Sequence, residues 1–133
     1  MYLDAEGKEV QLKSKSGGLY CKNRFSEVER ISIPTNMMAF QLGESTQIQT
    51  GGLVEATPHS VVKSNEIAGK NISRNTFVVF IEPHKLQEMR TPEGISPEKV
   101  HVNHYGVRPI KDRWDNGILF KEFENRAQHT YVS

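Results

Sequence analysis

The sequence has a single cysteine, Cys21, so no disulfide can form within the chain. One unpaired cysteine is typical of a reducing compartment, and we expect a cytoplasmic protein. Long apolar runs are also missing, because the strongest, from Phe77 to Ile81, is far shorter than a membrane span of about 20 residues. Residues 1–8 lack the apolar core of a signal peptide. These absences argue against a secreted disulfide scaffold and a helical membrane protein.

An excess of charge of one sign is missing as well. The 17 Lys and Arg residues nearly balance the 16 Asp and Glu residues, the formal net charge is +1, and the signs are mixed along the chain. Such a chain has no strong field to attract nucleic acid or an anionic membrane, so we expect neither as a partner. The sequence also contains no glycine-rich phosphate loop and no nucleophile elbow.

What is present is a series of short β-like segments, each closed by turn residues. The segments cover residues 18–22, 27–33, 37–42, 46–50, 53–56 and 59–62, and the strongest covers residues 75–81. Short strands at this spacing predict a mostly β fold, either a sandwich, a barrel or a jelly roll.

The two ends of the chain differ from this central block. Residues 1–17 are polar and rich in turn formers, which predicts a loop or a hairpin insertion. Residues 84–133 predict an irregular excursion followed by a C-terminal helix packed outside the β structure. Leu119, Phe123 and Ala127 are four residues apart there, and Asn116 is a candidate N-cap.

An ordered set of motifs runs from Gly18 to Pro83. In chain order they are Gly18-Leu19-Tyr20, Ile33-Pro34, Gly43-Glu44, Ile48-Gln49-Thr50-Gly51-Gly52, Ala56-Thr57-Pro58-His59-Ser60-Val61, Arg74-Asn75-Thr76 and Phe80-Ile81-Glu82-Pro83. Their order and spacing resemble the second half of the double-stranded β-helix, a jelly roll, in isopenicillin-N-synthase-like Fe(II)/2-oxoglutarate-dependent dioxygenases. The resemblance covers roughly half of the chain, and residues 18–83 would be the C-terminal half of that jelly roll.

The resemblance implies a role for three residues. His59 corresponds to the distal metal histidine, and Arg74 with Thr76 corresponds to the pair that holds the far carboxylate of 2-oxoglutarate. Fe(II) of this type takes two imidazoles and one carboxylate on one face, which leaves positions open for cosubstrate and oxygen. A guanidinium suits a carboxylate because it donates two parallel hydrogen bonds. Thr76 follows Arg74 by two residues, so both side chains point to the same face of a strand.

One part of the family pattern is missing. No His-x-Asp motif, which supplies the other two metal ligands, occurs in the sequence; Asp4 lies at a tolerable distance before His59, but Tyr2 occupies the histidine position. The resemblance therefore implies a C-terminal fragment of an oxygenase that oxidises a small organic molecule, inactive alone. The motif would be encoded upstream of Met1, or the chain would be a degenerate paralogue that has lost it. The alternative is a non-catalytic jelly-roll module that binds a carboxylate or another protein.

The remaining candidate residues give weaker indications of a functional site. His101 and His104 form a His-x-x-His that a loop explains better than a metal site, and Cys21 is expected to be a buried inert thiol. Because the absence of the first half of a jelly roll would leave the edges of the remaining strands uncovered, we also expect self-association through exposed strand edges, above all through Phe77–Ile81.

Overall fold

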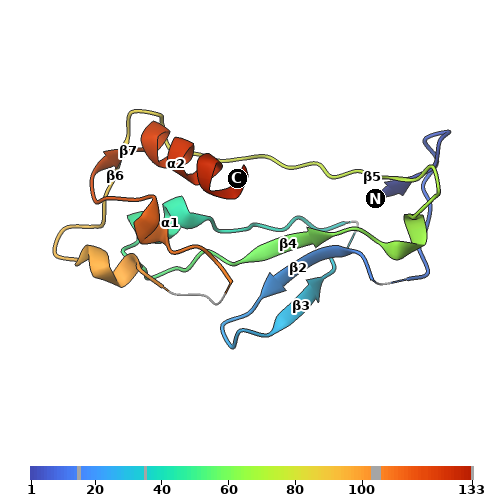
Figure 1. The fold of residues 1–133 in the computed structure, drawn as a ribbon, viewed down its shortest axis with the longest axis horizontal. Helices are drawn as coiled ribbons and strands as arrows, with labels where there is room; N and C mark the ends of the chain where they lie inside the picture. Colours follow the sequence, from blue (N-terminus) through green and yellow to red (C-terminus); the bar gives the residue numbers. More distant parts are fainter. Residues whose placement is uncertain (15, 35, 103–105, 133) are drawn as a thin grey trace. The chain divides into compact units, whose positions relative to one another are not determined.

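The computed structural model describes residues 1–14, 16–34, 36–102 and 106–132, with side chains as far as residue 130. The chain divides into two compact units, and each unit is built from two separate stretches. Unit 1 comprises residues 1–38 and 59–80, and unit 2 comprises residues 39–58 and 81–133. Figure 1 shows the strands and helices of both units.

Unit 1 contains two small antiparallel sheets. In the first, β2 (Gly18–Lys22) lies between β3 (Val28–Ile31) and β4 (His59–Val62). In the second, β1 (Tyr2–Leu3) pairs with β5 (Ser73–Arg74). A short 3-10 helix, η1 (Asn65–Ile67), follows β4 and is capped by Ser64, whose hydroxyl accepts a hydrogen bond from the Glu66 amide.

The sheets of unit 1 have little apolar cover. Among the described residues, Ile67 is the one large apolar side chain of unit 1 that is buried. Directly opposed residues share a face of a sheet, so Val61 lies with Leu19 on one face of the three-stranded sheet and Val28 lies with Lys22 on the other. Val61 and Val28 are both exposed, so neither face of this sheet is fully packed.

Unit 2 holds the hydrophobic core. Its elements are α1 (Glu44–Gln49), β6 (Glu88–Met89), the 3-10 helices η2 (Pro97–Val100) and η3 (Ile110–Asp112), β7 (Ile118–Leu119) and α2 (Phe120–Val132). Strands β6 and β7 pair antiparallel. The buried core consists of Ile48, Met89, Val100, Ile110, Trp114, Phe120 and Phe123.

The helix α1 occupies residues that the sequence predicts as a strand. The alternation of Thr46, Ile48 and Thr50 suggested a strand, but only Gln47 and Ile48 of the helix are buried. Thr50 caps the helix, and Gly51 and Gly52 close it with amides that donate to the carbonyls of Ile48 and Gln47. Two glycines with φ of 63° and 81° supply the left-handed conformation that this helix ending requires.

Three other predicted strands are not formed. Residues 37–42, 53–56 and 75–81 have no strand partner among the described residues, and β propensity alone does not hold a strand without a ladder of hydrogen bonds. The predicted cap at Asn116 is also wrong, because β7 comes first and α2 begins at Phe120. Asn116 instead accepts a hydrogen bond from the Thr91 amide at 3.0 Å.

The fold is therefore mostly strands in small antiparallel sheets with a C-terminal helix, and no closed barrel is present in the described part of the chain. The C-terminal helix contributes Phe120 and Phe123 to the core of unit 2. None of the described helices combines the length and the apolar character that crossing a membrane would need.

A buried ion pair joins the two stretches of unit 2. The Arg113 side chain has no exposed surface, and its guanidinium bonds both carboxylate oxygens of Glu44, with Nε donating at 3.2 Å. Its Nη1 donates to the carbonyls of Arg108 and Pro109, each at 3.1 Å. The adjacent Trp114 donates from Nε1 to the Met89 carbonyl at 2.8 Å. This part of the core is thus held together by hydrogen bonds of the fully buried Arg113 guanidinium and the buried Trp114 indole, with Glu44 partly exposed.

The substitution Glu44→Gln tests how much unit 2 depends on this pair. It leaves the Arg113 charge buried without its counter-ion, so we expect the free energy of unfolding to fall by about 2–4 kcal/mol. The matched control is Glu122→Gln, which breaks the exposed pair of Glu122 with Arg126 and should cost about 1 kcal/mol or less. Urea titrations of the three proteins would measure both, and equal losses would contradict a structural role for Arg113.

Candidate functional site

His59 is the first residue of β4 and follows Pro58 directly. It is exposed, and it stands opposite Cys21 of β2, which in turn stands opposite Glu29 of β3. The three side chains therefore form a row across one face of the sheet. The Glu29 carboxylate is turned to the hairpin, where it accepts a hydrogen bond from Asn23 Nδ2 at 2.6 Å.

Arg74 is the last residue of β5, in the other sheet of unit 1. It pairs with Tyr2, and the next residue, Asn75, exchanges two backbone hydrogen bonds with Met1. Arg74 and Thr76 are both exposed, and Thr76 lies beyond the end of the strand. The structure thus keeps Arg74 and Thr76 close along the chain and places His59 in a different sheet.

A complete metal site is absent from the described residues. Nowhere in residues 1–14, 16–34, 36–102 and 106–132 do three His, Cys, Asp or Glu side chains gather closely enough to hold an ion. Asp4 has a local role, because its Oδ1 accepts the amides of Glu6 at 3.1 Å and Lys8 at 2.8 Å and so closes a turn. The described donors, with His59 as one imidazole, do not make the three-ligand set that Fe(II) requires.

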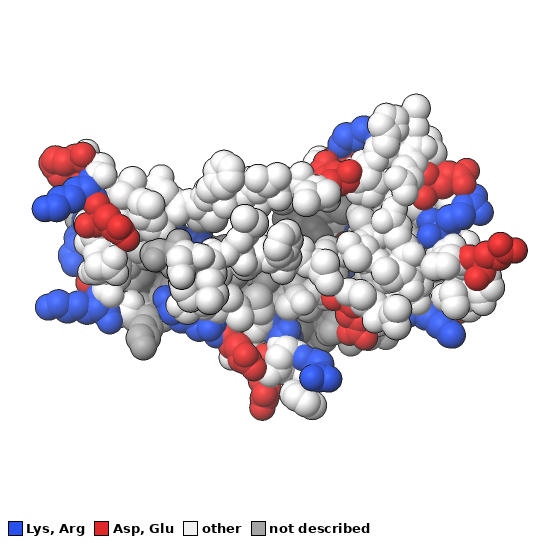
Figure 2. All heavy atoms as spheres, turned by 180° about the vertical axis from the view of Figure 1, so that it is seen from behind, with Lys and Arg blue, Asp and Glu red and all other residues white. Residues whose placement is uncertain are grey.

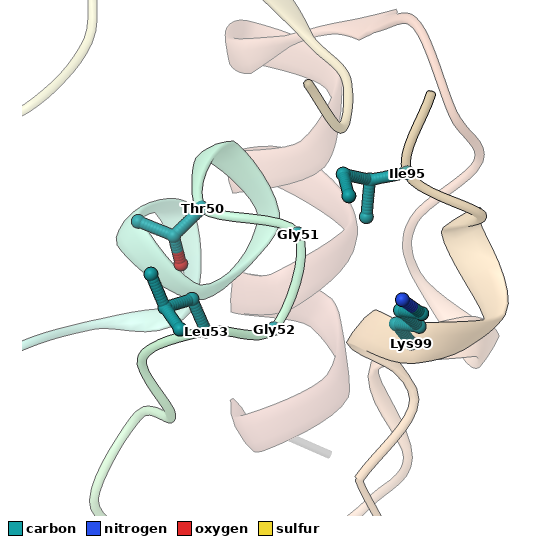
Figure 3. Close-up of a pocket in the computed structure, with 6 residues that line it drawn as sticks. All are labelled: Thr50, Gly51, Gly52, Leu53, Ile95 and Lys99. Atoms are coloured by element: carbon teal, nitrogen blue, oxygen red, sulfur yellow. The ribbon is translucent and has the colours of Figure 1, made fainter. Parts of the chain in front are cut away.

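A hollow of about 300 Å³ lies in unit 2, beside the C-terminal end of α1. Figure 3 shows Thr50 and Leu53 on one side of it and Ile95 and Lys99 on the other. The glycines Gly51 and Gly52 complete its lining. The Lys99 ammonium is the one charged group of this lining, and Leu53 and Ile95 make the rest largely apolar.

The two glycines of this hollow let distant segments approach one another. A Cβ on Gly51 would lie 2.5 Å from Ile95 Cγ2, and a Cβ on Gly52 would lie 2.3 Å from the Lys99 carbonyl oxygen. No real Cβ tolerates such distances, so both positions require glycine for packing as well as for φ. The glycine pair was the signal in the sequence, but nothing in the sequence identified Ile95 and Lys99 as its neighbours.

The structure describes only one of the two histidines of the His101-x-x-His104 motif. His101 is partly buried and lies 5.7 Å from the Trp114 ring, centroid to centroid. Its Nδ1 is buried without a hydrogen-bond partner among the described residues. His104 lies outside the described residues, so the structure neither supports nor opposes joint metal binding by the two.

The charged surface agrees with the balanced composition. On the face shown in Figure 2, acidic and basic side chains lie near one another, with uncharged surface between the groups. Ion pairs near the surface include Lys85 with Glu124 at 2.6 Å and Arg126 with Asp115 at 2.8 Å. The hydrogen bond from Lys85 to Glu124 raises the pKa of the lysine.

The Cys21 thiol gives a way to test the environment beside His59. Burial raises the pKa of this thiol, so the folded chain holds its proton more tightly than the unfolded chain does. We expect the rate of alkylation by iodoacetamide to rise at a higher pH in the folded protein than in urea, and stability to decline as pH rises through this range. Because Cys21 is the only cysteine, the assay reads one site. A lower midpoint in the folded protein would instead mean that the His59 imidazole activates the thiol.

Comparison with known proteins identifies no relative of this chain. No family model matches the chain, and neither the curated proteins nor the solved structures contain a significant match.

Proposed function

We propose that the chain is the C-terminal part of an Fe(II)/2-oxoglutarate-dependent oxygenase of the isopenicillin-N-synthase-like superfamily, which oxidises a small organic molecule. In this proposal His59 is one metal ligand, and Arg74 with Thr76 anchors the 2-oxoglutarate carboxylate. The observation that carries it is the ordered series of motifs from Gly18 to Pro83, within which His59 opens an exposed strand directly after Pro58.

The state of the two sheets of unit 1 supports the proposal. A sheet is stable when another layer buries its apolar face, and the sheet of β2, β3 and β4 leaves Val28, Val61 and Val62 exposed. A jelly roll closes two sheets over one core, with strands contributed by both halves of the sequence. Uncovered faces are what half of such a fold would present.

The charge on Arg74 supports it as well. The guanidinium is exposed, and no hydrogen bond or ion pair is found for it within the described residues. Its fork is therefore available for a carboxylate, and the hydroxyl of Thr76 two residues later can donate a further hydrogen bond.

The iron itself needs ligands beyond those described. His59 alone would hold Fe(II) without the chelate advantage of a second imidazole and a carboxylate, so no catalytic step is assigned to this chain. When bound in a complete site, Fe(II) supplies the oxygen chemistry, while the protein orients the reactants. The contribution we assign to this chain is the placement of one imidazole and of the cosubstrate anchor.

The second candidate is a non-catalytic jelly-roll module. It is favoured by one observation, the absence of a three-ligand metal group from the described part of the chain. Such a module would bind a carboxylate at Arg74 or pair with another protein through exposed strand edges, and it would have no use for iron at His59. The oxygenase and the carboxylate-binding module therefore agree on Arg74 and differ on His59.

Binding measurements on the purified chain distinguish the oxygenase proposal from the non-catalytic module. We expect weak Fe(II) binding, no succinate production from 2-oxoglutarate, and a measurable affinity for 2-oxoglutarate by calorimetry. Arg74→Lys should weaken that affinity about tenfold or more, because a bidentate bond to a charged group is lost. The control is Arg24→Lys, since Arg24 is an exposed arginine in the β2–β3 turn of the same unit.

The outcomes have distinct meanings. Equal 2-oxoglutarate affinity in the Arg74→Lys and Arg24→Lys proteins would remove the anchor role, and with it the oxygenase proposal and the carboxylate-binding form of the module. Stoichiometric, tight Fe(II) would show that other residues complete the metal site. If Fe(II) raises the 2-oxoglutarate affinity and His59→Ala abolishes the increase, the oxygenase reading is favoured over the module.

A further inference from the structure

The segment 76–83, which follows β5 and Asn75, is mostly apolar and has no backbone partner among the described residues. Figure 1 shows it leaving β5 as a drawn-out trace without helix or strand. No backbone hydrogen bond joins residues 76–83 to another described residue. Its large side chains face solvent: Phe77 is 92% exposed, Phe80 80% and Ile81 87%. A run of this kind, uncharged and rich in β formers, is a template for pairing with another strand.

The ladder between β1 and β5 shows which edge of this strand faces β1 and which edge faces away from it. Asn75 exchanges two hydrogen bonds with Met1, so its backbone groups point to β1. Tyr2 and Arg74 form the intervening pair, which is the non-hydrogen-bonded kind, so the backbone groups of Arg74 point to the opposite edge. If the extended conformation continues, Arg74, Thr76, Val78, Phe80 and Glu82 all present their amides and carbonyls on that opposite edge.

Two residues of opposite charge flank the uncharged segment 75–81. Residues 75–81 carry no charge, Arg74 precedes them and Glu82 follows them. Arg74 has no ion pair within the described residues, and Glu82 has one long exposed contact, 3.9 Å to Lys85. Because the two positions are an even number of residues apart, both side chains lie on the same face of an extended strand. The segment is therefore complementary in charge to its own antiparallel copy.

We propose that residues 74–82 pair antiparallel with the same residues of a second copy of this chain, about a two-fold axis at Val78. This register places Arg74 opposite Glu82 of the copy at both ends. A two-fold axis at Phe77 would place Arg74 opposite Phe80, and an axis at Val79 would place it opposite His84. The charges therefore select the axis at Val78 among the neighbouring registers.

The apolar side chains also fit this register. On one face Phe77 lies opposite Val79 of the copy, and on the other face Thr76 lies opposite Phe80. Pairs of an aromatic with a β-branched residue are among the favourable cross-strand pairs. The contact is isologous, because the same surface serves on both chains, so pairing through this edge closes as a dimer.

The dimer shares one group with the proposed function. Arg74 cannot bond the Glu82 carboxylate of the copy and the 2-oxoglutarate carboxylate at the same time. The two uses of Arg74 therefore compete, and each is measured separately, one by association state and the other by calorimetry. The dimer itself requires nothing of the oxygenase proposal.

Charge reversal tests the register. Sedimentation equilibrium of the full chain should give a monomer–dimer equilibrium. Arg74→Glu or Glu82→Arg places like charges opposite each other twice and should raise the dissociation constant about tenfold. The double variant Arg74→Glu with Glu82→Arg should restore it to within a few fold of the original. A monomer at all concentrations, or a double variant as weak as the single ones, would overturn the proposal.

Two further variants locate the contact. Phe77→Asp should abolish the dimer, whereas Phe40→Asp, at a phenylalanine that is 81% exposed outside the segment, should leave it unchanged. In a Cys21→Ser background, Val78→Cys should form an intermolecular disulfide on oxidation, because directly opposed strand residues lie within disulfide range. Val61→Cys, also exposed, should not. A dimer that survives Phe77→Asp, or equal cross-linking at both cysteines, would place the contact elsewhere and overturn the proposal.

Discussion

The core of unit 2 depends on the burial of one full charge. A guanidinium without exposed surface is tolerable only when its donors are satisfied, and the carboxylate of Glu44 and the carbonyls of Arg108 and Pro109 do this for Arg113. Glu44 is the first residue of α1, so the pair also fixes the start of that helix. Gln47, one turn later, donates to the Val100 carbonyl at 2.7 Å and accepts the Ala56 amide at 2.7 Å. These hydrogen bonds of Glu44 and Gln47 hold α1 in the position from which Ile48 packs into the core.

The sequence correctly predicts those elements in which the alternation or spacing of apolar residues matches the face that is buried in the structure. Residues 18–22 and 59–62 are strands as expected, and residues 27–33 contain β3. Of the predicted helical stripe, Phe123 and Ala127 lie on α2, whereas Leu119 ends β7. The failures share a cause, which is that local alternation does not reveal whether a partner strand exists. At residues 46–50 alternation concealed a helix whose inward face is only Gln47 and Ile48.

The candidate site shows the same limit. His59, Arg74 and Thr76 came from their place in an ordered series of motifs, and a series fixes neither the sheet in which each residue stands nor its neighbours. The row of Glu29, Cys21 and His59 depends on strand register, and register is a property of pairing. Likewise Arg113 and Glu44 are 69 positions apart, so their ion pair left no trace in local sequence. Residue identity was informative about chemistry and much less so about proximity.

The division of each unit into two stretches has a consequence for how the protein is made. A ribosome delivers residues in order, and Ile48 is released long before Trp114, Phe120 and Phe123, which complete its core. During that interval α1, with its buried face uncovered and Glu44 without its counter-ion, gains nothing from tertiary packing, and a helix of six residues is too short to persist alone. Contacts between residues so far apart in sequence also slow folding, because the intervening chain must be closed into a loop first. The core of unit 2 can therefore assemble only after Trp114, Phe120 and Phe123 have been synthesised, and the apolar face of residues 44–49 stays uncovered until then.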